Sequence, residues 1–287
     1  MIFKKAVIVG IGILGGSLAQ AFKKYKICEE VTGLSRSNAH ELAKNFGIID
    51  RGFHLEDIDA GVYDADLVIL CMPVKNIIEY IPIVSKIVKD GCIITDVGST
   101  KRAIMNEAAK TPEDSVHFVG GHPMAGSEKT GFLAGSPDLF LKRPYAVTNQ
   151  PGNAPEAFLL LIEMIRKIGA LPIELDPETH DTIVAGISHL PQVLSTALMN
   201  YVGEKQDSSE GFFEMSGPAF REFTRVSGSS YIMWEDIFAT NADNIKLMIS
   251  GMIKELQTMK ENLDKQEMND LFDKANRFRK ILTKDKG

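Results

Sequence analysis

A single histidine in a glycine-rich segment is the best candidate for proton transfer in this sequence. His122 lies within Gly120–Gly126, which contains three glycines and a proline and can therefore hold the backbone close to a ligand. A neutral imidazole, whose ordinary pKa is about 6.5, accepts an alcohol proton at neutral pH. Ser99 follows another apolar run and could hydrogen-bond to both the imidazole and a cofactor. We therefore predict that His122 is a general base for alcohol oxidation, with Ser99 beside it. A loop histidine that only caps a turn is the alternative.

Alcohol oxidation also needs a hydride acceptor, and the N-terminal segment predicts one. A G-x-G-x-x-G pattern directly follows an apolar run and opens a helical pattern, in the order Gly10, Ile11, Gly12, Ile13, Leu14, Gly15. Gly10 permits a tight turn, Gly12 lets a pyrophosphate approach the backbone, and Gly15 permits close packing of helix and strand. The turn Met72-Pro73, after a later apolar run, could pass the nicotinamide ribose. A glycine turn without a ligand is the alternative.

The end of the second apolar run indicates which nucleotide binds. Sites that prefer NAD usually place Asp or Glu there to hold the ribose 2′-hydroxyl. This sequence instead has Ser35, Arg36 and Ser37, and its nearby acids, Glu29 and Glu30, precede the run. A guanidinium offers a bidentate fork to phosphate oxygens, so this triplet suits the 2′-phosphate of NADP. We predict NADP or NAD as cofactor, with NADP preferred; Arg36 as a plain surface charge is the alternative.

Short apolar runs alternate with helical patterns in the first part of the chain. The predicted strands are Ala6–Val9, Val31–Leu34, Leu67–Cys71, Cys92–Thr95, His117–Val119, Tyr145–Thr148 and Ile173–Leu175. The predicted helices are Gly15–Lys24, Asn38–Phe46, Val74–Val88, Lys101–Ala109 and Pro155–Ile168. This alternation predicts an α/β fold: a Rossmann-type, doubly wound and largely parallel sheet in residues 1–175. Only helical patterns follow, which predicts a second, all-helical domain in residues 176–287, with the active site in the cleft between the domains.

The helical region carries an apolar stripe at spacings of 4, 3, 4, 3 and 4, made by Ile245, Ile249, Met252, Leu256, Met259 and Leu263. Such a stripe covers one helix face. Packing within the chain and packing against a second copy explain it equally well. A further apolar set, from Met268 to Leu282, predicts one more helix. We expect a homodimer that forms through the helical domain.

Composition argues against several classes of partner. The formal net charge is -6, and no Lys/Arg stripe supplies the phosphate contacts that nucleic acids require, so an anionic substrate needs a local cation. The N-terminus has no signal-peptide layout, and no run reaches about 18 uninterrupted apolar residues. The histidines show no metal-ligand spacing, and the three cysteines form no C-x-x-C pair. We expect a cytoplasmic protein without metal, membrane or nucleic-acid binding.

Several segments together resemble the prephenate dehydrogenase family, namely Asp96–Ser99, Val119–Lys129, Ile187–Pro191, and Phe223–Arg225 with Trp234 nine residues later. The resemblance implies NAD(P)-dependent oxidative decarboxylation of prephenate to 4-hydroxyphenylpyruvate, or of arogenate to tyrosine. It implies that His122 takes the ring hydroxyl proton, that Ser99 links cofactor and imidazole, and that Arg225 binds a substrate carboxylate. It also places His189 near the substrate or the domain junction and Trp234 against the pocket, and it puts Glu128 in a polar group at the pocket mouth. For Trp234 an ordinary core position is the alternative.

Two departures from the family pattern concern the substrate side chain. Family members often have Ser-His-Leu-Pro-His, where this chain has Gln192 in place of the last histidine. A glycine-rich run is often seen where this chain has Gly217-Pro218-Ala219. The choice between prephenate and arogenate therefore stays open. Two more remote readings are a β-hydroxyacid dehydrogenase or imine reductase, which would need a catalytic lysine in the helical domain, and a non-catalytic NADP sensor. His180, next to Asp181, is expected to pin the domain junction.

Overall fold

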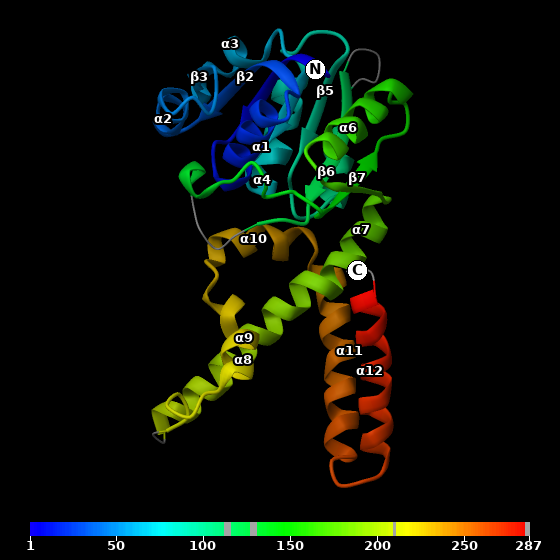
Figure 1. Cartoon of the computed structure of the whole chain (residues 1–287). Coiled ribbons are helices and arrows are strands. Elements are labelled where there is room, and N and C mark those ends of the chain that lie inside the picture. The colour runs from blue at the N-terminus through cyan, green and yellow to red at the C-terminus, as the bar shows by residue number, and fades with distance from the viewer. Residues whose placement is uncertain (112–115, 127–130, 209–210, 285–287) are drawn as a thin grey trace.

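A computed structural model describes residues 1–111, 116–126, 131–208 and 211–284 of the chain. Its first part is a single eight-stranded sheet in the order β3-β2-β1-β4-β5-β6-β7-β8 (Figure 1). The strands are β1 Phe3–Val9, β2 Cys28–Ser35, β3 Arg51–His54, β4 Leu67–Leu70, β5 Cys92–Asp96, β6 Val116–Pro123, β7 Pro144–Asn149 and β8 Leu171–Glu174. All neighbouring pairs are parallel except β6 and β7. The predicted α/β fold with a largely parallel, doubly wound sheet is confirmed.

Helices cover both faces of this sheet and leave its core apolar on each side. They are α1 Ile13–Lys24, α2 Ala39–Asn45, α3 Ile58–Val62, α4 Val74–Ser85, α5 Arg102–Ala108 and α6 Pro155–Lys167, with short 3-10 turns η1 Leu55–Asp57 and η2 Phe132–Ala134. Along β1, Ala6 and Ile8 pack into one cluster with α1 and α6, whereas Val7 and Val9 pack into another with α3, α4 and α5. Burial on both faces explains why the strands read as continuous apolar runs.

Two histidines lie at the far edge of the sheet. His54 lies in β3, a short strand that the sequence pattern did not predict. His40 lies on α2 and is buried, and its backbone N–H and its ring both bond to the Ser35 hydroxyl. Polar residues such as Arg51 interrupt the apolar pattern of β3, since this strand pairs at the edge of the sheet and is only half-buried.

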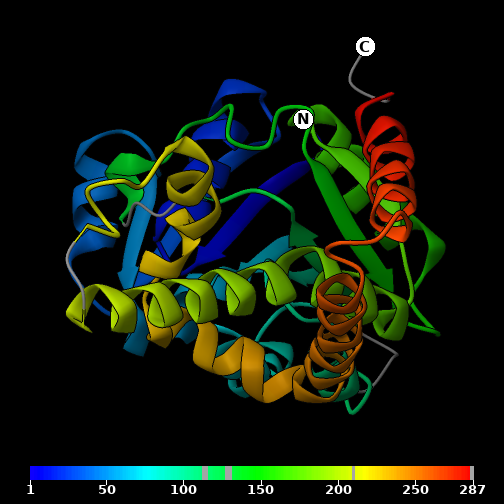
Figure 2. The same cartoon turned by 90° about the horizontal axis from the view of Figure 1, so that it is seen from below.

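The second part of the chain is helical from Pro177 onward. It contains α7 Pro177–Val184, the π-helical turn η3 Ala185–His189, α8 Leu190–Ser208, α9 Pro218–Thr224, η4 Arg225–Gly228, α10 Tyr231–Thr240, α11 Ala242–Glu261 and α12 Glu267–Lys284. Figures 1 and 2 show α7 and α8 as one long rod beneath the sheet, while α11 and α12 form a hairpin that points away from it. In the predicted stripe, Ile245 on α11 is buried, but Leu256 is 53% exposed. Leu263 is 69% exposed and was wrongly expected on the same helix, because α11 ends at Glu261.

The rod made by α7, η3 and α8 is unusually apolar for a helix with so little cover. Among the described helices, the stretch Pro177–Asp207 is long and apolar enough, by length and composition, to cross a membrane. Only 28% of its most apolar window is buried within the chain. Apolar helix faces therefore stay uncovered both on this rod and on α11.

The helical part is joined to the sheet by carboxylates that cap helices of the first part. Asp181 on α7 accepts the backbone N–H groups of Lys101 (2.7 Å) and Arg102 (3.0 Å) at the start of α5. Asp236 on α10 accepts the N–H of Lys75 (3.1 Å) in the first turn of α4. The Arg102 guanidinium also forms a bidentate pair with Asp243 on α11. These contacts hold the helices against the carboxyl edge of the sheet.

Candidate active site

In the glycine turn after β1, the fold requires glycine at positions 10 and 15 but not at position 12. Gly10 has a φ of 108°, and a Cβ there would lie 2.2 Å from the Cys71 carbonyl oxygen. A Cβ on Gly15 would lie 2.0 Å from the Gly10 carbonyl oxygen. Gly12, just before α1, has an ordinary φ of -92°, and a Cβ there would meet nothing within 4 Å. Open space therefore lies in front of Gly12 at a helix start without an acidic residue, which fits a pyrophosphate.

The three residues predicted to bind a 2′-phosphate differ in exposure: Ser35 is buried, whereas Arg36 and Ser37 are exposed. The Ser35 hydroxyl donates to the Ser37 carbonyl oxygen (2.7 Å) and accepts the His40 N–H (3.0 Å). Ser35 is buried, and its hydroxyl is used to shape the turn after β2. Arg36 and the Ser37 side chain are exposed at that turn. Arg36 and Ser37 thus present the polar groups that a ligand could reach.

Candidate groups gather where four neighbouring strands end. Gly10 follows β1, Met72 and Pro73 follow β4, Ser99 follows β5, and His122 lies near the end of β6. These four strands are consecutive in the sheet, in the order β1-β4-β5-β6. In open α/β sheets, ligands bind in the crevice outside the carboxyl ends of the strands. The predicted cofactor turn and the predicted base therefore share one edge of the sheet.

The imidazole of His122 has a partner that the sequence analysis did not assign to it. His122 Nδ1 lies 2.9 Å from His180 Nε2, and His180 Nδ1 lies 2.8 Å from Asp181 Oδ1. His180 is 1% exposed and Asp181 is fully buried. Ser99, the expected partner, is half-buried in the loop between β5 and α5. The adjacent His180-Asp181 pair was the sequence signal for this contact.

Electrostatics keep His122 in its neutral form. Burial lowers its pKa well below the usual 6.5, and the neighbouring His180, Lys101 and His189 lower it further. Lys101 is fully buried and ion-paired with Asp96, which is equally buried. Since a positive charge already lies close by, a proton on His122 is costly. A neutral imidazole at physiological pH is the form that a general base requires.

The Asp96 carboxylate ties together the strand ends that carry this site. Besides the Lys101 ammonium, it accepts the N–H of Gly98 (2.7 Å) in the Ser99 loop. It also accepts the N–H of Gly121 (3.0 Å), next to His122. A Cβ on Gly121 would lie 2.6 Å from the Asp96 carbonyl oxygen, so a glycine is required here for close approach. The buried pair thus fixes the backbone on both sides of the predicted Ser99–His122 contact.

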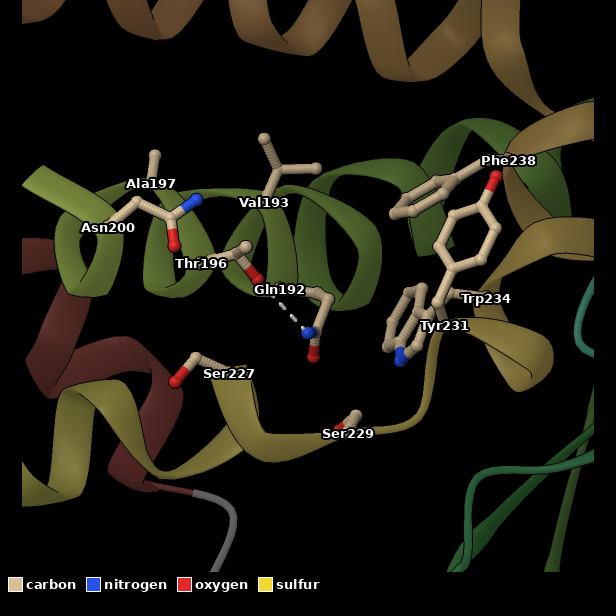
Figure 3. Close-up of a pocket in the computed structure, with 10 residues that line it drawn as sticks. All are labelled: Gln192, Val193, Thr196, Ala197, Asn200, Ser227, Ser229, Tyr231, Trp234 and Phe238. Carbon is tan, nitrogen blue, oxygen red and sulfur yellow. Dashed lines mark hydrogen bonds between the residues drawn. The ribbon is translucent and has the colours of Figure 1, made fainter.

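A cavity of about 390 Å³ lies in the helical part of the molecule (Figure 3). Its lining comes from α8, from η4 and the turn after it, and from α10, and consists of Gln192, Val193, Thr196, Ala197, Asn200, Ser227, Ser229, Tyr231, Trp234 and Phe238. The Gln192 side chain donates to the Thr196 hydroxyl at 3.3 Å. The Trp234 indole Nε1 is buried and has no hydrogen-bond partner in the described part of the chain. Figure 3 shows Gln192 and Trp234 directed toward the same space near Ser229.

His189 connects this cavity to His122. Its ring stands edge-on to Trp234, with centroids 5.9 Å apart, and its charge state influences the pKa of His122. Burial lowers the pKa of His189 to about 4. The Asn241 side-chain amide donates to the Asp181 carbonyl oxygen (2.8 Å) and lies 3.3 Å from His189 Nδ1. A neutral His189 that accepts this bond through Nδ1 carries its proton on Nε2.

Two residues predicted to bind the substrate, Arg225 and Glu128, are not among the described residues that line the cavity. Arg225 begins η4, is exposed, and lies two residues before Ser227 of the cavity lining. Glu128 lies outside the described residues. The structure therefore brings His122, His189 and the Gln192–Trp234 cavity together, and it places Arg225 on the segment that borders them. The described residues include no cluster of three or more His, Cys, Asp or Glu side chains able to hold a metal.

Comparisons with known proteins match this architecture over nearly the whole chain. The model of the prephenate dehydrogenase nucleotide-binding domain matches residues 18–174, and that of the prephenate dehydrogenase dimerization domain matches residues 176–276. The chain belongs to the prephenate dehydrogenase family. The resemblance inferred from the sequence motifs is thereby confirmed.

Individual relatives of this family align over nearly the whole of this chain. A prephenate dehydrogenase of Lactococcus lactis is 29% identical over 99% of this chain and 79% of its own length. A crystal structure of the Aquifex aeolicus prephenate dehydrogenase with hydroxyphenyl propionate and NAD+ is 26% identical, covers 97% of this chain and 98% of its own, and superimposes with a TM-score of 0.83. An arogenate dehydrogenase of Synechocystis is 25% identical, covers 97% of this chain and 100% of its own, and has a TM-score of 0.81.

Proposed function

We propose that this protein catalyses the NAD(P)-dependent oxidative decarboxylation of prephenate to 4-hydroxyphenylpyruvate, a step toward tyrosine. The observation that carries the proposal is His122, held neutral and hydrogen-bonded to His180, at the sheet edge that also bears the open Gly12 turn. A ligand-sized cavity, with His189 packed against its Trp234, lies in the adjoining helical part. Family membership supports the reaction class, and the Aquifex relative was crystallised with NAD+ and a hydroxyphenyl acid.

The proposed mechanism needs little covalent chemistry from the protein. His122 accepts the proton of the ring hydroxyl through Nε2, and Ser99 links the cofactor and the imidazole. A nicotinamide dinucleotide held at the open Gly12 turn would supply the acceptor for the hydride of the ring carbon that bears this hydroxyl. Arg225 grips a substrate carboxylate by charge-assisted hydrogen bonds, while Gln192 and Trp234 hold the side chain. Loss of the ring carboxylate as CO₂ makes the ring aromatic, so the residues mainly orient the substrate and hold the proton.

Prephenate is proposed over arogenate because of the cavity's hydrogen-bonding groups. The buried Trp234 Nε1 is a donor without a partner in the described chain, whereas Gln192 offers both an N–H and a carbonyl oxygen and suits either substrate. A keto oxygen accepts such donors, whereas the ammonium group of arogenate is itself a donor and needs acceptors or an anion. Nicotinamide reduction measured with each substrate and each cofactor tests this proposal. Higher kcat/KM with arogenate would favour the arogenate dehydrogenase alternative.

We propose NADP as the preferred cofactor because Arg36 is exposed at the end of β2. Its guanidinium can bind the 2′-phosphate, with the Ser37 hydroxyl beside it. Arg36→Ala should lower kcat/KM for NADP by about tenfold or more, the effect of losing a charge-assisted contact, and should leave kcat/KM for NAD nearly unchanged. Arg166→Ala, an exposed arginine in the last turn of α6, is the control. Higher kcat/KM with NAD in the unaltered enzyme would refute the preference.

We also propose that a helical domain of residues 176–287 forms a homodimer and that the enzyme works in the cytoplasm. The matching family model is described as a dimerization domain. Exposed apolar side chains on α11 and α12 support an interface there, among them Leu256, Phe272 and Leu282. Light scattering after size exclusion should give twice the chain mass. A monomer at micromolar concentration would refute the dimer.

A further inference from the structure

The strongest unassigned feature beside the site is the buried chain of hydrogen bonds from His122 to His180 to Asp181. We propose that His180 and Asp181 are positioning residues that fix the tautomer of His122 and take over the charge of the proton that it accepts. This inference rests on the proposed function for its role in turnover, but the tautomers themselves are properties of the free protein.

The hydrogen-bond donors around Asp181 fix the first link. Its carboxylate accepts the N–H groups of Lys101 and Arg102, and it lies 2.8 Å from His180 Nδ1. A carboxylate that receives two backbone N–H bonds acts as an acceptor, so His180 Nδ1 must carry a proton. The backbone of Asp181 is held as well, because its carbonyl oxygen accepts the Asn241 amide. Asp181 therefore has little freedom to rotate away.

The second link follows from the first by proton counting. A neutral imidazole carries one N–H, so a His180 protonated on Nδ1 has a bare lone pair on Nε2. That lone pair lies 2.9 Å from His122 Nδ1, which must then donate. A neutral His122 with its proton on Nδ1 has its lone pair on Nε2. The buried pair thus sets which nitrogen of His122 is basic.

The same chain offers a place for the positive charge of the reaction. When Nε2 of His122 takes the substrate proton, its Nδ1 proton can move to His180 Nε2, which leaves His122 neutral. His180 then carries both protons next to the Asp181 carboxylate. The titratable groups facing these rings are the Lys101 ammonium at the start of α5 and the neutral His189 on η3, and Lys101 disfavours a charge that stays on His122. After product leaves, the proton returns through His122 to solvent.

Two substitutions separate the two roles of His180. His180→Gln supplies an oxygen that accepts the His122 Nδ1 proton and an amide that donates to Asp181, but it cannot take up a proton. His180→Phe removes both functions. We expect kcat to fall by about tenfold for His180→Gln and by at least about a hundredfold for His180→Phe, in line with the loss caused by a wrong tautomer in other enzymes. KM should change less than threefold by this reasoning, about 0.7 kcal/mol at most. His117→Gln, on the same strand as His122 but remote from the relay, is the matched control.

A nitrogen-15 NMR spectrum of the histidine-labelled free enzyme tests the assignment without turnover. Six histidines are present, and single His→Gln variants assign their signals. We expect His122 and His180 to be protonated on Nδ1, and His180→Gln to keep the His122 tautomer. A His122 protonated on Nε2 would overturn the proposal, as would a folded His180→Phe variant with kcat within threefold of the unaltered enzyme. If His180→Phe does not fold, the spectrum and His180→Gln decide.

The kinetic readout also distinguishes proton transfer from a purely structural role. In mixtures of H₂O and D₂O, the rate of the unaltered enzyme should depend on deuterium content with curvature, since two protons move, whereas His180→Gln should give a straight line. Straight lines for both would overturn the charge transfer to His180. Absence of any turnover of prephenate by the unaltered enzyme would instead refute the proposed function, and the tautomers would still be measurable.

Discussion

Two glycines of the same turn should respond in opposite ways to alanine. Gly12 has an ordinary φ and open space where a Cβ would lie, so Gly12→Ala should keep the free energy of unfolding within about 1 kcal/mol. A methyl group there would separate a pyrophosphate from the start of α1. Loss of one charge-assisted hydrogen bond is worth about 1.5–3 kcal/mol, which raises the Kd for the dinucleotide about ten- to hundredfold.

Gly10→Ala should do the reverse, because its conformation belongs to the fold. A φ of 108° is strained for alanine, by about 1–2 kcal/mol, and the Cβ would also overlap the Cys71 carbonyl oxygen at 2.2 Å. The combined loss should exceed about 2 kcal/mol and lower Tm by at least about 4 °C. Thermal unfolding and dinucleotide titration by fluorescence measure both effects. An unchanged Kd for Gly12→Ala, or equal Tm values for the two variants, would refute the reasoning.

Three further expectations concern histidines and the guanidinium. His122→Asn should lower kcat about a hundredfold or more while the Kd for dinucleotide stays constant. Normal turnover by this variant would refute the assignment of His122 as the general base. Arg225→Ala should raise KM about ten- to hundredfold through a lost charged contact of about 1.5–3 kcal/mol, and an unchanged KM would contradict its role. For His189, the folded pKa of about 4 lies below the unfolded value of about 6.5, so its contribution to stability is present above pH 6.5 and is lost toward pH 4. Urea unfolding should show about 3 kcal/mol of this loss, and His189→Gln should lack it.

Local patterns predicted the fold well because most of the sheet is buried on both faces. Strands such as β1 and β4 consist almost entirely of buried apolar residues, which a sequence shows directly. β3 escaped prediction because it is short and partly polar. The reversed direction of β7 also left no local signal, since strand direction depends on which neighbour a strand pairs with. Pairing is a property of the folded chain.

The site was predicted where chemistry and spacing coincide, and missed where distant residues meet. His122 and Gly12 stand in local glycine-rich segments that are readable in one dimension. The His122–His180 contact joins positions 58 residues apart in the chain, and neither residue alone reveals it. The use of Ser35 as a turn former depends on the buried position of His40. Sequence reasoning therefore found the candidates but not their partners.

The helix caps that cross between the two parts have a consequence for how ligands enter. Asp181 and Asp236, both in the helical part, cap the N-terminal ends of α5 and α4. Moving the two parts of the molecule apart would remove a capping group from each helix, at a cost of about 1 kcal/mol each. It would also break the paired guanidinium of Arg102. Substrate exchange by wide hinge opening is therefore disfavoured. Substrate and product should instead enter and leave through the open side of the cavity, while the two parts of the molecule keep their relative position.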